Sequence, residues 1–171
     1  MTRLVRKLDK KIWIDKEVAS REGWLDTGSV CADALKNFKT SENRLSVFSL
    51  AQEDLLPRIV CAIVASPNTK NVPDTDYVIF DRSIIAELGI STEDTSGETL
   101  DDEVNSLHID LTRLSGLKLV QFAEKLQEHG KIGRITKKEL AKVLNTQIQA
   151  GTFVESELSE DLLASIKKHT R

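Results

Sequence analysis

Two β-rich segments decide the fold that this sequence predicts: Arg44-Leu-Ser-Val-Phe-Ser-Leu50 and Tyr77-Val-Ile-Phe80. The first has the β-branched and aromatic content of a strand, and the second is a continuous apolar run, typical of a strand buried on both faces. A helical pattern over 54–65 separates them, with Asp54 placed to cap it and Pro57 tolerated in its first turn. Strand, helix, strand in this order predicts a βαβ unit whose two strands lie parallel in one sheet.

The chain beyond residue 110 has the pattern of helices. Ser115 is placed to cap a helix over 115–129, and Thr136-Lys-Lys-Glu139 is a capping box for a helix that ends near Gly151. The segment between them is short and contains glycine, so we interpret it as a loop. We therefore expect the two helices to pack against each other through their apolar stripes.

Together these patterns predict an α/β or α+β fold in which a small sheet, containing the parallel βαβ unit, packs against helices. A shift in composition near residue 111 divides the chain into an α/β portion, 1–110, and a helical portion, 111–171, which we expect to form one compact unit. The 171 residues are 40% hydrophobic, enough for one core of that size.

Composition excludes several classes of protein. No apolar run approaches the length of a membrane span, and no signal-peptide pattern is present, so we expect a cytoplasmic protein. The 24 Lys and Arg residues are outnumbered by 27 Asp and Glu, which argues against wholesale wrapping of nucleic acid. Cys31 and Cys61 follow no metal-binding spacing, and the sequence carries no cofactor fingerprint.

The first candidate for chemistry is a pair of carboxylates at the ends of the predicted parallel strands. Asp54 follows one strand and Asp81 follows the other. Ligands of open α/β sheets bind beyond the carboxyl ends of the strands, where converging carboxylates can hold Mg²⁺ for phosphoryl chemistry. The competing interpretation is that each aspartate caps the helix that follows it.

The second candidate is His108-Ile-Asp110, which follows several acidic residues. A histidine beside a carboxylate can act as a general base or bind a metal. If residues 107–111 are extended, His108 and Asp110 share one face while Leu107, Ile109 and Leu111 point inward. The competing interpretation places both residues in a solvated acidic loop.

The third candidate is a basic region that suits nucleic acid. The segment 136–144 resembles the first helix of a helix-turn-helix motif, but the helix-forming stretch after it, 146–150, is too short for a recognition helix. A basic solvated face explains the same charges. The cations that define the region are Lys125, Lys131, Arg134, Lys137, Lys138 and Lys142.

Charge segregation leads to the functional prediction. The segment 91–110 carries seven acids and no Lys or Arg, and we interpret it as a loop lying between basic regions. Such segregation suits electrostatic docking. We therefore expect a non-enzymatic interaction protein, an accessory subunit of a bacterial multi-protein system, that binds another protein or a second copy of itself. The alternatives are a metal-dependent phosphoryl-transfer enzyme or nuclease and a nucleic-acid-binding regulator. The expected partner-binding residues are Asp101, Asp102, Glu103, Lys131, Arg134, Lys137 and Lys138.

Overall fold

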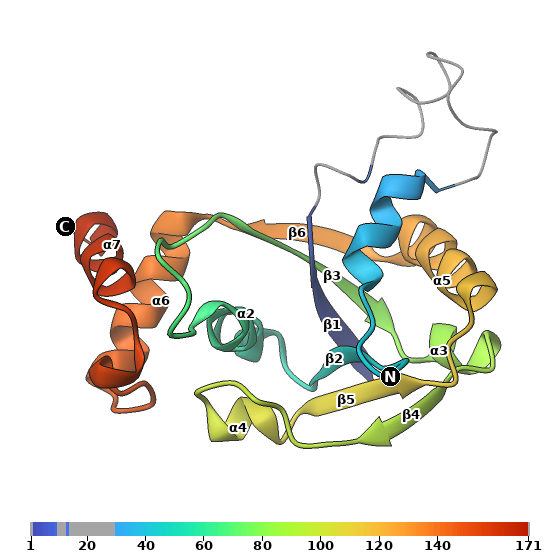
Figure 1. Ribbon diagram of the computed structural model, residues 1–171, viewed down its shortest axis with the longest axis horizontal. Coiled ribbons are helices and arrows are strands. Elements are labelled where there is room, and N and C mark those ends of the chain that lie inside the picture. The colour runs from blue at the N-terminus through green and yellow to red at the C-terminus, as the bar shows by residue number, and fades with distance from the viewer. Residues whose placement is uncertain (1, 10–12, 14–29, 171) are drawn as a thin grey trace, which may run out of the picture.

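A six-stranded sheet forms the centre of the molecule, in the order β4-β5-β2-β1-β3-β6 (Figure 1). The computed structural model describes residues 2–9, 13 and 30–170. Each neighbouring pair of strands in this sheet is antiparallel. The strands are β1 (Arg3–Leu8), β2 (Leu45–Leu50), β3 (Thr75–Asp81), β4 (Ser91–Asp94), β5 (His108–Thr112) and β6 (Lys131–Ile135).

The predicted parallel βαβ unit is not confirmed, because β1 lies between β2 and β3 in the sheet. Val5 of β1 is opposite Phe48 of β2 on one side and Ile79 of β3 on the other. Both pairings are antiparallel, so β2 and β3 run in the same direction without touching as neighbours. The result is a mixed helix and strand architecture of the α+β type, with a split β-α-β unit in place of the predicted one.

Helices cover both faces of the sheet (Figure 1). The 3₁₀-helix η2, α3 and α5 contribute their buried residues to one core, and α2, α4, α6 and α7 contribute theirs to the other. The helices are η2 (Ala32–Phe38), η3 (Glu53–Leu55), α2 (Leu56–Val64), α3 (Ser83–Glu87), α4 (Asp102–Asn105), α5 (Gly116–His129), α6 (Lys137–Gln149), η4 (Glu155–Glu157) and α7 (Glu160–Thr170). Among the described residues, no helix has the length and apolar character required to cross a membrane.

Neighbouring residues of β1 show how the sheet separates these two cores. Leu4 and Val5 are both fully buried, yet Leu4 packs with Phe122 of α5 and Val5 packs in the core that holds Leu140 of α6. Successive side chains of a strand point to opposite faces, so a central strand contributes to both cores. Burying each large apolar side chain fully stabilises the fold by about 1.5–3 kcal/mol.

The segment between α5 and α6 is a strand, so the predicted loop is wrong. β6 pairs antiparallel with β3 at the edge of the sheet, and the helices on either side of it bury their apolar stripes in different cores. The predicted packing of 115–129 against 137–150 is therefore wrong as well. β6 has the composition of a loop, because it contains Gly133 and the cations Lys131 and Arg134, yet it is paired as a strand.

The local capping predictions have mixed outcomes. Ser115 Oγ accepts a hydrogen bond from the Lys118 N–H, and Thr136 forms the full capping box with Glu139, as predicted. The prediction for Asp54 is wrong: α2 begins after the 3₁₀ turn η3, with Leu55 at its N-cap position and no side-chain cap.

Candidate functional site

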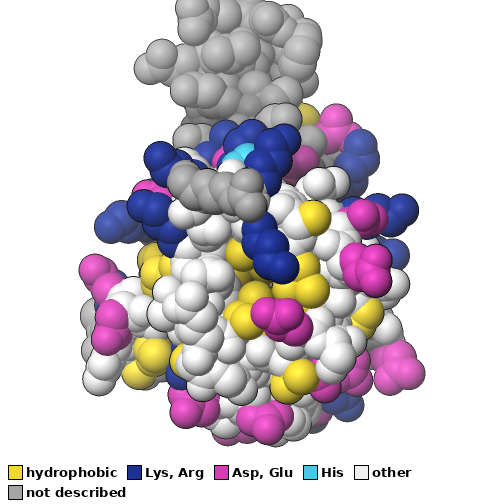
Figure 2. All heavy atoms as spheres, turned by 90° about the vertical axis from the view of Figure 1, so that its left-hand side faces the viewer, with side chains coloured by type: hydrophobic (Ala, Val, Ile, Leu, Met, Phe, Trp, Pro, Cys, Tyr) yellow, Lys and Arg dark blue, Asp and Glu magenta, His cyan; other side chains and the backbone are white. Residues whose placement is uncertain are grey.

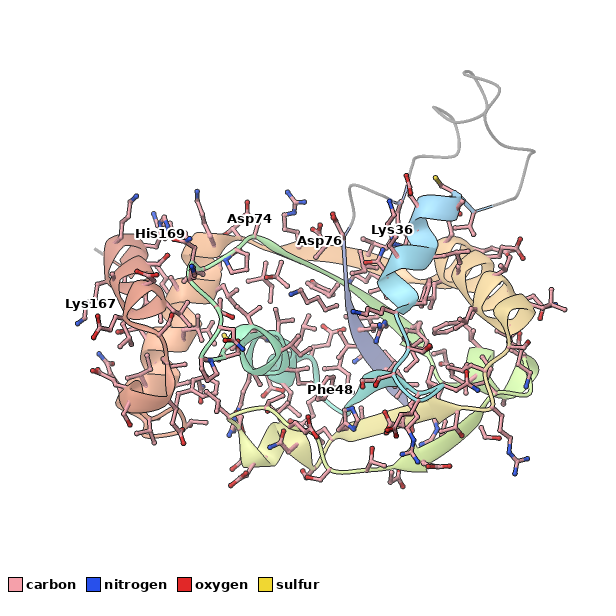
Figure 3. The ribbon with its side chains drawn as sticks, viewed as in Figure 1. Lys36, Phe48, Asp74, Asp76, Lys167 and His169 are labelled. Atoms are coloured by element: carbon pink, nitrogen blue, oxygen red, sulfur yellow. The ribbon has the colours of Figure 1, made fainter. Side chains whose placement is uncertain are left out.

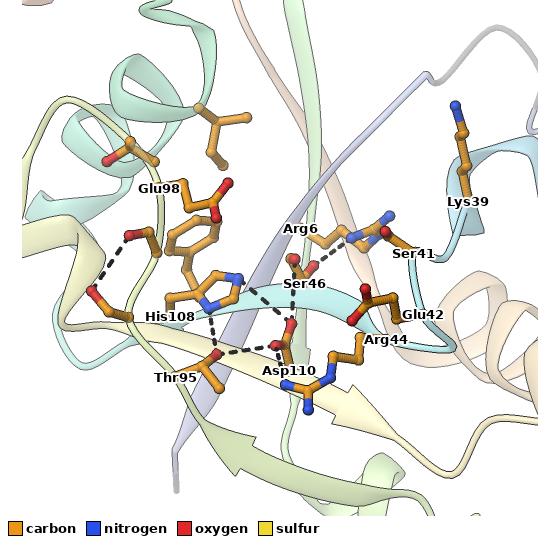
Figure 4. A pocket seen from close by; sticks show the side chains of 15 residues that line it. Arg6, Lys39, Ser41, Glu42, Arg44, Ser46, Thr95, Glu98, His108 and Asp110 are labelled. Atoms are coloured by element: carbon orange, nitrogen blue, oxygen red, sulfur yellow. Dashed lines mark hydrogen bonds and ion pairs between the residues drawn. The ribbon is translucent and has the colours of Figure 1, made fainter.

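A polar pocket of about 660 Å³ opens on the face formed by β2 and β5 (Figure 4). His108 and Asp110 of β5 line it, while Ile109 and Leu111 are buried in the core on the other face. The predicted alternation is confirmed from His108 to Leu111, but it is wrong for Leu107, which precedes β5 and packs against the other core. Segments 39–44 and 95–99 complete the wall, so the pocket collects residues that are far apart in the sequence.

Thr95 links the histidine to the aspartate. Its Oγ1 lies 2.9 Å from His108 Nδ1 and donates to Asp110 Oδ2 at 3.1 Å. His108 Nε2 lies 3.8 Å from Asp110 Oδ1. Because the single hydroxyl hydrogen of Thr95 goes to the carboxylate, its oxygen accepts from Nδ1–H of the imidazole. Thr95 is thus not arranged as a nucleophile that His108 deprotonates.

Asp110 also contacts Ser46 of β2 and Arg44, the residue before β2. Arg44 Nη1 lies 3.4 Å from Asp110 Oδ2, and Arg44 Nη2 lies 3.3 Å from Glu93 Oε2. Ser46 Oγ donates to Asp110 Oδ1 over 3.5 Å. Asp110 is 7% exposed, and a buried polar group of this kind needs such hydrogen-bonding partners.

Arg6 is the cation at the back of the pocket. Its guanidinium donates to the carbonyl of Asn37, at 2.6 Å from Nη2, and to the carbonyl of Ser46. It also lies 6.0 Å from the centre of the Phe38 ring, within cation–π range. Burial lowers the pKa of Arg6 to about 10, so the group remains charged at neutral pH. The backbone carbonyls, which carry only partial negative charge, hold it in place.

This arrangement is a preorganised polar wall. Thr95 is hydrogen-bonded to both His108 and Asp110, and positive and negative side chains line the pocket in equal number. It suits the binding of a polar group better than proton transfer. Thr95, Arg44, Ser46 and Arg6 come from other strands and loops, so no local pattern in the sequence associates them with His108.

Asp54 and Asp81 occupy different environments in the structure. Asp81 Oδ1 accepts a hydrogen bond of 2.8 Å from the N–H of Ser83, the first residue of α3. Arg82 holds the N-cap position and α3 has no side-chain cap, so the prediction that Asp81 caps this helix is not confirmed. The hydrogen bond from Ser83 lowers the pKa of Asp81. Asp54 lies exposed in η3. Within the part of the chain that the structure describes, no group of three or more His, Cys, Asp or Glu side chains is placed to hold a metal ion.

The acidic segment 91–110 is a loop only in part: β4 and α4 lie within it, β5 begins at His108, and residues 95–101 form the irregular connection from β4 to α4. Asp101 is 1% exposed and accepts two hydrogen bonds from Arg58, at 2.6 Å from Nε and 2.9 Å from Nη2. It also accepts from the Glu103 and Val104 N–H groups at the start of α4. Arg58 contacts the Glu103 carboxylate as well. The Asp101 carboxylate is therefore bound by groups of the fold itself, while Asp102 is exposed.

The predicted basic residues also divide into two groups. Arg134 forms a two-pronged ion pair with the buried carboxylate of Asp76, at 2.6 Å and 3.0 Å. Lys131, Lys137 and Lys138 are exposed. The stretch interpreted as a short second helix, 146–150, is the end of α6 itself, so the helix-turn-helix resemblance does not extend to a recognition helix.

α7 brings further cations to the same end of the molecule. Figure 2 shows Lys and Arg side chains gathered around a histidine at the top of the face that includes α6 and α7, with most of the acidic side chains below them. Lys167 and His169 lie at the upper end of α7 (Figure 3). We call this surface the basic end; it comprises Lys70, Lys137, Lys138, Lys167, Lys168 and His169.

No family model, curated protein or solved structure matches this chain. Functional inference therefore rests on the geometry described above.

Proposed function

We propose that this protein is a non-enzymatic interaction module, an accessory subunit that docks onto an acidic surface of another protein through its basic end. The observation that carries the proposal is that the described cations of the basic end form no ion pairs, whereas Arg44, Arg58 and Arg134 are all paired. Unneutralised charge at one end favours oriented association with an oppositely charged partner.

The distribution of acidic residues supports the same proposal. Glu93 and Asp94 are exposed on β4, which lies far from α6 and α7 (Figure 1), and Asp102 is exposed on α4. A protein with net charge −3 that concentrates positive charge at one end presents that end to an acidic partner. The acidic neighbours Asp74 and Asp161 favour a patterned protein surface over the uniform phosphate backbone of nucleic acid.

The state of the His108 cluster supports a binding role over an enzymatic one. Thr95 directs its hydrogen to Asp110, and the carboxylate has further partners in Arg44 and Ser46. The predicted cytoplasmic location and bacterial multi-protein system belong to the same proposal. The free thiols of Cys31 and Cys61 support a reducing compartment.

The test is charge reversal with a matched control. Lys137→Glu/Lys138→Glu alters the basic end, and Lys36→Glu/Lys39→Glu makes the same change in net charge at η2 and the residue after it. Each purified variant is compared with wild type for recovery of a native partner complex, with the contact mapped by lysine cross-linking and mass spectrometry. We expect the first variant to lose the complex and the second to retain it.

Two outcomes contradict the proposal. Equal recovery by both variants excludes docking through the basic end. The second outcome is binding of a single-stranded or duplex oligonucleotide that is lost in the first variant and whose affinity falls steeply between 50 and 200 mM salt. It would identify a nucleic-acid regulator, because neutralising phosphates releases counterions, and about six phosphate contacts cost roughly 10³-fold or more in affinity over that range. Phosphoester turnover abolished by His108→Gln, with the fold intact, identifies an enzyme.

A further inference from the structure

A second pocket, of about 640 Å³, lies within the basic end. Three separate parts of the chain form it: the segment 70–72, the first residue of α6 and one face of α7. The residues used in the argument are Lys70, Lys137, Asp161, Ser165, Lys168 and His169.

The pocket collects positive charge around one carboxylate. Three lysines line it, with Asp161 as its one acidic group among the described residues. Asp161, Ser165 and Lys168 are four and three residues apart, so they form one stripe along α7 that faces the 70–72 segment. The charge is therefore concentrated by the packing of α7.

Ser165 provides a hydroxyl donor at the wall of the pocket. It is 8% exposed, and its Oγ accepts a hydrogen bond of 3.1 Å from the Val72 N–H. Its own hydroxyl hydrogen has no acceptor among the residues that the structure describes, although the side chain lines the pocket. A buried hydroxyl donor without an acceptor is costly unless a ligand or water accepts from it.

We infer that this pocket binds a phosphate-type oxyanion, in particular the diphosphate or phosphoryl group of a small molecule. A tetrahedral dianion offers several acceptor oxygens, which match the Ser165 hydroxyl and the ammonium groups of Lys137 and Lys168. The volume exceeds that of one phosphoryl group and lies within the range of small-molecule sites. The inference goes beyond the docking function and does not depend on it, because Lys138 and Lys167 belong to the basic end without lining the pocket.

The experiment is isothermal titration calorimetry of the full chain with pyrophosphate, in metal-free buffer at low ionic strength. Lys167→Ala is the matched control for Lys168→Ala: the two residues are neighbours on α7, and Lys167 points away from the molecule (Figure 3). We expect saturable binding of one pyrophosphate per chain. Lys168→Ala should weaken it about tenfold, the effect of removing one charged contact, while Lys167→Ala leaves it unchanged.

Ser165→Ala provides the second variant. It should weaken binding about threefold or more by removing a neutral donor, and thermal melting checks that the fold remains intact. In the wild type, the Val72 amide signal in NMR spectra should shift with pyrophosphate, because that N–H is bonded to Ser165. Equal weakening by Lys167→Ala and Lys168→Ala, or the lack of saturable binding, overturns the inference. Binding of an oligonucleotide without binding of pyrophosphate also overturns it, in favour of a nucleic-acid surface.

Discussion

Tyr77 and Gly133 are paired directly across β3 and β6, and the tyrosine ring lies over the glycine. A Cβ atom at position 133 would stand 2.8 Å from Cε2 of that ring and closer still to Cζ and the hydroxyl oxygen. An aromatic ring that covers a cross-strand glycine compensates for the packing that glycine lacks. This contact explains how a strand with so little apolar surface is held at the edge of the sheet.

We predict that Gly133→Ala lowers the free energy of unfolding by about 1–3 kcal/mol, because the added methyl group forces the Tyr77 ring to move. In the double variant with Tyr77→Ala, the two costs should not add, since the clash is gone. Urea denaturation of the four proteins measures the coupling. Gly116→Ala is the control, because a Cβ there meets nothing within 4 Å, and strict additivity of the two changes would contradict the prediction.

Asp101 should be the most sensitive residue of the acidic segment. Asp101→Asn removes the charge that pairs with Arg58 and leaves that guanidinium partly buried, which we expect to cost about 2–4 kcal/mol. Asp102→Asn, one residue later and exposed, should change stability by less than about 0.5 kcal/mol. Thermal and chemical denaturation compare the two variants. Similar losses in both would show that the cost comes from net charge and not from the internal pair.

The capping box of α6 should make stability depend on pH. Thr136→Ala is expected to cost about 1 kcal/mol at neutral pH. Hydrogen bonds from Thr136 lower the pKa of Glu139 in the folded protein, so the ionised carboxylate favours folding. That contribution is complete above the ordinary glutamate pKa of about 4.3 and is lost as the pH falls through the lower folded value.

The matching measurement is a pH series of urea melts on wild type and Glu139→Gln. The difference in free energy of unfolding should be constant near neutral pH and shrink toward acid. A difference that grows as the pH falls would contradict the assigned direction of the pKa shift.

The two cysteines should differ in reactivity. Burial raises the pKa of the Cys61 thiol to about 12, and the side chain is fully buried, whereas Cys31 is partly exposed. Because the thiolate is the reacting form, a disulfide reagent at about pH 8 should modify one thiol per native chain and two after unfolding. Cys31→Ser should abolish the fast reaction. Rapid modification of Cys61 in the native state would show that its core opens easily.

Patterns local to a few residues were the predictable part of the fold. The Ser115 and Thr136 caps and the alternation from His108 to Leu111 were evident from the sequence, because each depends on neighbours along the chain. The position of β1 was not predictable in this way. Its cations, Arg3, Arg6 and Lys7, give it a surface composition, and its pairing depends on residues more than 40 positions away.

In the candidate site, too, only contacts between residues close in sequence were predictable. His108 and Asp110 were predicted to share a face because they are two residues apart. Thr95, Arg44 and Ser46 reach them only through the pairing of β5 with β2 and the path of the 95–99 segment. Asp101 was predicted as a docking residue because charge normally indicates exposure, and only the approach of Arg58 from α2 explains its burial.

The central position of β1 has a consequence for how the molecule can be divided. Without this one strand, the sheet separates into a three-stranded part, β4-β5-β2, and a two-stranded part, β3-β6, with no hydrogen bonds joining them across the gap. All the strand-to-strand hydrogen bonds that connect the two parts of the sheet are made by a segment of six residues. A peptide with the sequence of β1, supplied in trans to a chain that lacks it, is therefore the natural unit for fragment complementation, and association of the two pieces can be read out as recovery of the whole fold.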